Sequence, residues 1–150
     1  MGELTALITG KLVAFDTAPL IYYIEENQEY LPLADELFSA IDGGIVQSIT
    51  SVLTLQEVLV APLRDGRPDL ADKYREVLTR SANVTLHVID ESICEIAAQM
   101  RASHTWLRTP DALQVATALR HGAEIMVTND ARWDRLSEIE VVVLRTLIKP

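Results

Sequence analysis

Short apolar runs alternate with helical patterns along the whole chain. Runs of strand length cover residues 11–15, 45–49, 84–89, 124–128 and 140–144. Between them, apolar residues recur at the three- and four-residue spacing of helices, over residues 17–26, 31–41, 52–64, 69–82, 90–100 and 109–121. This alternation predicts an α/β fold in a single domain, 1–150, with a central, mainly parallel sheet of four to five strands flanked by helices on both faces.

The stretch 108–130 combines a helix and a strand in one unit. Thr109 is a candidate N-cap, and Pro110 suits the first helical position because its missing N–H is not needed there. Asp111 then lies in the first turn, where the helix dipole favours a carboxylate. The following apolar run stops just before Asp130. Each end of the helix–strand unit therefore carries an aspartate.

Carboxylates occupy the positions where such a fold binds ligands. In a parallel α/β sheet, the carboxyl ends of the strands and the amino ends of the following helices lie at one edge. Asp16 follows the first apolar run, Asp130 follows the fourth, and Asp111 begins a helix. Glu57 lies about two turns into its helix among apolar residues, so we expect a largely buried environment for it. These four acids are expected to meet at one edge of the sheet.

Carboxylates packed together repel one another and raise one another's pKa. A hard divalent cation such as Mg²⁺ or Mn²⁺ removes this conflict, because it takes oxygen ligands and keeps waters that can be activated as nucleophiles. Each acid also has a purely structural interpretation. These interpretations are a helix cap for Asp16, a favourable helix charge for Asp111, a turn residue for Asp130, and an ion pair with an arginine for Glu57.

Three segments resemble motifs of the PIN-domain ribonucleases, a family that includes the VapC-type toxins of toxin–antitoxin pairs. FDTAPLIYYIE, residues 15–25, is similar to the family's opening strand, aspartate and helix. TSVLTLQEVL, residues 50–59, is similar to the segment that carries its glutamate. TPDALQVATALRHGAEIMVTND, residues 109–130, is the most specific match, with its aspartate, its small-residue ATA packing segment and a strand that ends in TND. The resemblance extends over nearly the whole chain and implies a PIN-like, Rossmannoid fold.

The resemblance also implies an activity and a set of site residues. The metal-binding and catalytic acids would be Asp16, Glu57, Asp111 and Asp130, with Asp134 as a further candidate ligand. They would hold one or two Mg²⁺ or Mn²⁺ ions that activate water to attack an RNA phosphodiester. Hydroxyl and amide support near the metal would come from Thr17, Thr128 and Asn129. A toxin of this type would form a homodimer and be neutralised by a small antitoxin protein.

The net charge of −9 disfavours simple electrostatic attraction to nucleic acid, but the charge is unevenly distributed. Residues 1–60 hold nine acidic residues and one basic residue, a charge of −8, whereas residues 61–150 hold thirteen acidic and twelve basic residues, a charge of −1. A bound polyanion would therefore be held mainly by the second half of the chain. Candidate phosphate contacts that flank the site are Arg108, Arg132, Arg135 and Arg120, and for Arg120 solvated surface charge is the better explanation.

Aromatic and cysteine residues add less to the picture. Trp106 and Trp133 could stack on unpaired bases, although packing in the core or in an interface explains them equally well. The single cysteine, Cys94, cannot form an internal disulfide, which fits a reducing cytoplasm. No apolar run approaches the ~20 residues that span a bilayer, so we expect no membrane association.

Two other functions remain open on sequence grounds. An aspartate-dependent phosphohydrolase would use Asp16 as its nucleophile, but such enzymes resemble a D-x-D motif, and this chain has Ala18 at the second position. A non-catalytic interaction module would carry the same acids with weak metal binding or none. Metal titration separates this module from a nuclease, and a covalent phospho-enzyme would indicate the phosphohydrolase.

Overall fold

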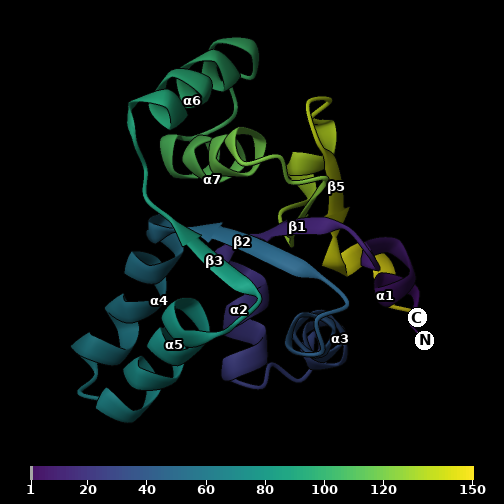
Figure 1. The fold of residues 1–150 in the computed structure, drawn as a ribbon, viewed down its shortest axis with the longest axis vertical. Helices are drawn as coiled ribbons and strands as arrows, with labels where there is room; N and C mark the ends of the chain where they lie inside the picture. The colour runs from purple at the N-terminus through teal and green to yellow at the C-terminus, as the bar shows by residue number, and fades with distance from the viewer. Residues whose placement is uncertain (1) are drawn as a thin grey trace.

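A single five-stranded sheet forms the centre of the computed structural model, which describes residues 2–150. All paired strands are parallel, and they lie in the order β3-β2-β1-β4-β5 (Figure 1). The strands are β1 (Leu12–Phe15), β2 (Gln47–Ser51), β3 (Val84–His87), β4 (Ile125–Thr128) and β5 (Glu140–Val143). The predicted α/β class and the parallel central sheet are confirmed.

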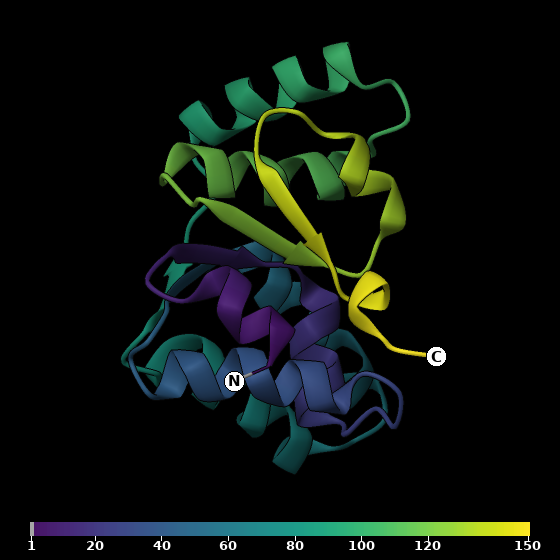
Figure 2. The ribbon, with the colours of Figure 1, turned by 90° about the vertical axis from the view of Figure 1, so that its right-hand side faces the viewer.

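Helices cover both faces of the sheet, as Figures 1 and 2 show. One face carries α1 (Glu3–Ile8), α2 (Thr17–Ile24), α3 (Leu31–Asp42), α4 (Val52–Arg64) and α5 (Pro68–Arg80). The other face carries α6 (Glu91–Ser103), α7 (Thr109–Arg120) and the short 3-10 turn η1 (Ala131–Arg135), which precedes β5. The 3-10 turn η2 (Leu144–Leu147) follows β5 and packs against the first face through Leu144 and Leu147. No helix of residues 2–150 has the length and apolar character needed to cross a bilayer.

The alternation of side chains along the central strands divides the interior into two cores. Val13 and Phe15 of β1 pack in the core beneath α1 to α5, whereas Ala14 between them packs beneath α6 and α7. In β4, Val127 faces the first core and Met126 the second. Both strands are buried on both faces, which explains why they appear in the sequence as continuous apolar runs.

The strand order places the ends of β1 and β4 side by side. Phe15 is in register with Val127, and the backbone N–H of Asp16 donates to the Val127 carbonyl over 2.9 Å. Asp16 therefore lies beside the end of β4. Asn129 and Asp130 follow directly after this strand, which ends at Thr128. This contact brings together the start of the chain and a segment more than a hundred residues later.

Several element boundaries differ from those predicted. The second strand spans Gln47–Ser51 and not 45–49, because Ile45 is 46% exposed in the turn before the strand while Ser48 and Thr50 are buried and hydrogen-bonded. The third strand ends at residue 87 and not at 89. The N-cap of α7 is Arg108, without a side-chain cap, and Thr109 is the first helical residue.

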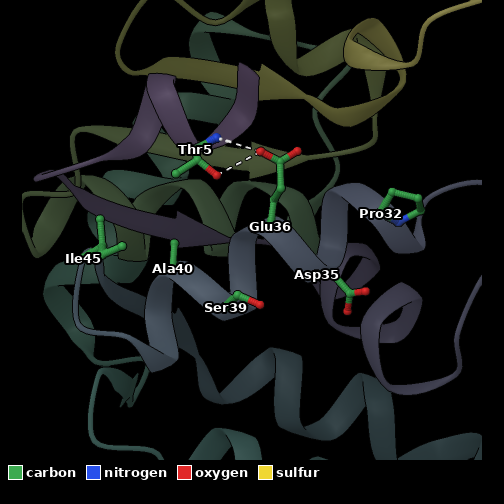
Figure 3. Close-up of a pocket in the computed structure, with 7 residues that line it drawn as sticks. All are labelled: Thr5, Pro32, Asp35, Glu36, Ser39, Ala40 and Ile45. Atoms are coloured by element: carbon green, nitrogen blue, oxygen red, sulfur yellow. Dashed lines mark hydrogen bonds between the residues drawn. The ribbon is translucent and has the colours of Figure 1, made fainter. Parts of the chain in front are cut away.

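Helix α1 is a finding that the apolar pattern does not predict. Leu4 and Ile8 are fully buried against the first core. Glu36 of α3 points toward the start of α1 (Figure 3), where its carboxylate accepts hydrogen bonds from the Thr5 backbone N–H over 3.2 Å and the Thr5 hydroxyl over 2.9 Å. The glutamate therefore satisfies an N–H of the first turn that has no partner within the helix. A shallow hollow lined by Pro32, Asp35 and Ile45 lies beside this contact.

We expect Glu36→Ala to lower the free energy of unfolding by about 1 kcal/mol, because the first turn of α1 loses its acceptor. Urea denaturation measures this change, and hydrogen exchange should locate the increased opening in residues 3–8. Asp35→Ala is the matched control, since Asp35 is exposed on the same helix. Equal effects of the two substitutions would show that the contact between Glu36 and Thr5 does not stabilise α1.

Candidate functional site

The four predicted acids come from four elements that meet at the carboxyl edge of the sheet. Asp16 caps α2 directly after β1, and Asp130 caps η1 directly after β4. Asp111 lies in the first turn of α7, and Glu57 lies in α4. The charges of Glu57 and Asp111 both raise the pKa of Asp16, and the charge of Asp130 raises that of Asp111. Asp111 therefore connects the four carboxylates electrostatically, since its charge acts on Asp16 and Glu57 and that of Asp130 acts on it.

Asp16 is the most strongly perturbed of these acids. Burial raises its pKa from 3.8 to about 6, and the nearby charges of Glu57 and Asp111 add to this effect. Two hydrogen bonds act in the opposite direction, from the Thr17 backbone N–H over 2.7 Å and from the Thr128 hydroxyl over 3.0 Å. The ionised form of Asp16 is thus held in place but is costly in the absence of a cation.

The prediction that Glu57 lies in a largely buried environment is wrong. Its side chain is exposed, because α4 turns Thr54 and Val58 toward the core and Glu57 toward the sheet edge. Partial desolvation still raises its pKa, the Thr17 hydroxyl lowers it, and the charge of Asp111 raises it. No arginine forms an ion pair with Glu57 in the part of the chain that the structure describes.

Arginines accompany the other two acids. Partial burial raises the pKa of Asp111, and Arg108, whose Nε lies 3.7 Å from the carboxylate, counteracts this effect. Asp130 forms a two-pronged pair with Arg132, with an Nη2–Oδ2 distance of 2.6 Å, and these hydrogen bonds lower the pKa of Asp130. Two of the four arginines that the sequence suggests as phosphate contacts, Arg108 and Arg132, are therefore paired with site acids.

The predicted supporting residues take different positions. Thr128 connects two acids, because its hydroxyl donates to Asp16 and accepts from the backbone N–H of Asp130 over 3.1 Å. The Thr17 hydroxyl is buried near Glu57 but makes no hydrogen bond of good geometry. Asn129 lines a hollow together with Asp16 and Asp130, but its side chain bonds to Tyr22 and Arg145 and not to the acids. Asp134, in η1, is exposed and makes no hydrogen bond or ion pair with another described residue.

A buried hydrogen-bond network behind the site was not predicted. Gln114 of α7 is 3% exposed, accepts from the Ser51 hydroxyl over 2.9 Å and donates to the Thr54 hydroxyl over 2.9 Å. It connects the helix of Asp111 to the helix of Glu57. Its place three residues after Asp111 puts both on one face of α7, which is the sequence feature that could have identified it.

The two tryptophans are not equivalent. Trp133 is fully buried in the core beneath α6 and α7, so it is unavailable to stack on a base. Trp106 is half-buried, with the guanidinium groups of Arg132 and Arg135 6.0 Å and 5.7 Å from its ring. Arg120 contacts Ser92 near the far end of α7, away from the acids.

The acids fit a hard divalent cation by ligand type, although their side chains are not arranged around one. Within residues 2–150, no group of three or more histidine, cysteine, aspartate or glutamate side chains is close enough to hold a metal. The reason is local: Asp16 caps α2, and both oxygens of Asp130 are engaged by Arg132. Burial, with a smaller contribution from the charges of Glu57 and Asp111, raises the pKa of Asp16, and a bound cation would offset the cost of ionising it.

Comparisons with solved structures show the same fold in toxin–antitoxin complexes. A toxin–antitoxin complex from Klebsiella pneumoniae contains a chain with 22% identity and a TM-score of 0.66, over 88% of this chain and 97% of that one. DNA-bound VapBC from Salmonella typhimurium matches with 17% identity and a TM-score of 0.66, over 89% and 98% of the two chains. VapBC-5 from Mycobacterium tuberculosis matches with 19% identity and a TM-score of 0.58, over 89% and 98%.

Sequence comparison gives the family. A search of curated protein sequences finds no match. The sequence model of the PIN domain, however, matches residues 13–139, which run from β1 to the residue before β5 and include all four acids. This chain belongs to the PIN-domain family.

Proposed function

We propose that this protein is a metal-dependent endoribonuclease and the toxin of a toxin–antitoxin pair. The observation that carries the proposal is the electrostatic coupling of Asp16, Glu57, Asp111 and Asp130 at one edge of the sheet. A cluster of like charges is costly to fold, and such perturbed groups are typical of functional sites. Membership of the PIN-domain family supports the same conclusion.

The four acids would hold Mg²⁺ or Mn²⁺ through their carboxylate oxygens. A bound cation would offset the negative charges and act as a Lewis acid that activates water for hydrolysis of the RNA phosphodiester. Thr128 keeps Asp16 oriented through its hydroxyl. Arg132 has to release Asp130 before that carboxylate can bind a cation, and it is then free to contact a phosphate.

The proposed partners are an RNA substrate, a small antitoxin and a second copy of the chain. The antitoxin is supported by the solved structures that share the fold, since these are toxin–antitoxin complexes. The homodimer rests on the resemblance of the sequence to the VapC-type toxins. Light scattering of the purified chain, alone and with the product of a neighbouring small reading frame, tests both partners.

A cleavage assay tests the proposed reaction. We expect single-stranded RNA to be cut in Mg²⁺ or Mn²⁺ and not in chelator, and Asp111→Asn to reduce the rate at least about a hundredfold. Asp72→Asn is the control, because Asp72 is an exposed acid on α5 that pairs with Arg75. Equal rates for wild type and Asp111→Asn would contradict the proposal.

One observation favours a non-catalytic interaction module as the second candidate. The pairing of Arg132 with Asp130 leaves no three-acid group among residues 2–150 in position to hold a metal. Calorimetric titration with Mn²⁺ separates the two candidates. Binding that is lost in Asp111→Asn supports the nuclease, and no binding by the folded wild type supports the module.

A further inference from the structure

A hollow of about 500 Å³ opens beside the acids and is lined by both signs of charge. Its charged lining residues are Asp16, Asp130, Arg132 and Arg145, and Tyr22 and Asn129 also line it. A ligand in this hollow would lie close to carboxylates of the proposed active site and to positive groups at the same time.

Asn129 fixes the positions of the Tyr22 hydroxyl and the Arg145 guanidinium. It is 5% exposed, and its side-chain oxygen accepts from the Arg145 backbone N–H over 2.8 Å. The backbone carbonyl oxygen of Asn129 accepts from Arg145 Nη2 over 2.7 Å, and its side-chain Nδ2 donates to the Tyr22 hydroxyl over 3.0 Å. The Tyr22 ring is further held by stacking on Tyr30, with ring centroids 4.7 Å apart. The guanidinium and the phenol are therefore pre-positioned on the wall of the hollow.

Arg145 differs from Arg108 and Arg132 because it forms no ion pair with a carboxylate, although its charge helps to lower the pKa of Asp130. Arg108 and Arg132 are each paired with a site carboxylate. Arg145 makes no ion pair with any carboxylate of residues 2–150, and its hydrogen bonds go to the neutral backbone and amide of Asn129. The Tyr22 hydroxyl accepts from Asn129, so its own proton is also free to donate.

We propose that Arg145, assisted by Tyr22, binds a backbone phosphate of the RNA next to the one that is cut. This inference rests on the proposed nuclease function. A guanidinium with unused N–H groups binds phosphate through parallel charge-assisted hydrogen bonds, and a nearby phenol adds a donor. The phosphate that the acids act on and the phosphate that Arg145 holds would then occupy the same hollow.

The test compares RNA binding and cleavage for Arg145→Gln, Arg145→Lys, Tyr22→Phe and the control Arg80→Gln. The control substitution removes the same positive charge at a distant position. Arg80 lies on α5, which packs on β3, and β3 and β5 are at opposite edges of the sheet (Figure 1). Anisotropy of a labelled single-stranded RNA in Ca²⁺ and in chelator gives Kd and its salt dependence. Steady-state cleavage in Mg²⁺ gives kcat and KM.

We expect Arg145→Gln to raise Kd and KM about tenfold and to leave kcat within about twofold of the wild type. The slope of the logarithm of the binding constant against the logarithm of the salt concentration should decrease in magnitude by about 0.7, the value for one phosphate contact on a single strand. Arg145→Lys should recover part of the binding, Tyr22→Phe should weaken it about threefold, and Arg80→Gln should leave it unchanged. If the wild type binds or cleaves RNA, and folded Arg145→Gln and Arg145→Lys have the same Kd, KM and salt slope as the wild type, the inference is overturned. The proposed nuclease function is then unaffected. A wild-type protein that neither binds nor cuts RNA overturns both.

Discussion

Asp16→Asn is expected to abolish RNA cleavage and, at the same time, to stabilise the metal-free protein at neutral pH. The activity should fall at least about a thousandfold, because a central carboxylate of the proposed metal site is lost. The stability should rise by about 1–3 kcal/mol, because a carboxylate whose pKa is raised to about 6 is costly to ionise in the folded protein. The asparagine oxygen can still accept from the Thr17 N–H, so the cap of α2 is retained.

The pH dependence of this stabilisation has a definite sign. The pKa of Asp16 is about 6 in the folded protein and 3.8 without its environment, so between these pH values the folded state binds more protons. The free energy of unfolding of the wild type therefore falls as the pH rises from about 4 to about 6. The advantage of Asp16→Asn should be small near pH 4, vanish below the unfolded-state pKa of 3.8, where both states are protonated, and reach its full size above pH 6.

Urea denaturation at pH 4, 5, 6 and 7.5 in chelator measures this advantage. Asp35→Asn, at an exposed position on α3, controls for the general loss of a negative charge. Saturating Mg²⁺ should remove or reverse the difference, because a ligand that binds the folded state stabilises the wild type. A stability difference that does not change with pH, or a fully active variant, would show that Asp16 is not the strained acid of the site.

The strand-end acids could be predicted from the sequence because their positions depend on local patterns. Asp16 and Asp130 each follow a short apolar run, and in a parallel sheet the ends of such runs share one edge. Asp111 follows from the proline and the first turn of its helix. The fold class follows from the same alternation of runs and helices.

Glu57 and α1 show where local patterns are insufficient. Apolar residues surround Glu57 in the sequence, but α4 keeps Val60 and Leu63 about half exposed, so apolar neighbours do not identify the buried side of this helix. Helix α1 depends on Glu36, thirty-one residues away, to satisfy its first turn. The exposure of Glu57 depends on which face of α4 packs on the core, and α1 depends on a contact with a distant part of the chain, so neither follows from the local pattern.

The roles of Arg145 and Asn129 in the hollow beside the acids could not be predicted, for a related reason. Arg145 follows the last predicted strand and lies outside every segment that the sequence singles out, but the structure forms η2 there and binds the arginine to Asn129, sixteen residues earlier. Asn129 was predicted to support the metal, yet its hydrogen bonds organise Tyr22 and Arg145. A residue's place next to a motif identifies it as part of the site, while its role depends on partners that only the fold supplies.

Replacement of Gln114 by methionine is expected to destabilise the protein by about 2–4 kcal/mol and to slow cleavage. Gln114 donates to Thr54, Thr54 in turn contacts Thr50 over 2.8 Å, and Thr50 donates to the carbonyl of Phe15 over 2.9 Å. This chain connects α7, α4, β2 and the residue before Asp16. Methionine fills a similar volume but leaves the buried Ser51 hydroxyl without its acceptor and Thr54 without its donor.

The expected loss of activity has a geometric cause, since the network sets how the elements that carry Asp16, Glu57 and Asp111 lie relative to one another. Urea denaturation gives the stability, and single-turnover cleavage at a temperature where the variant is folded gives the rate. Gln99→Met makes the same substitution at an exposed position of α6 and should change the stability by less than about 0.5 kcal/mol. If Gln114→Met is destabilised but cleaves RNA at the wild-type rate while folded, the network stabilises the protein without positioning the acids; if the two variants are equally stable, the network does neither.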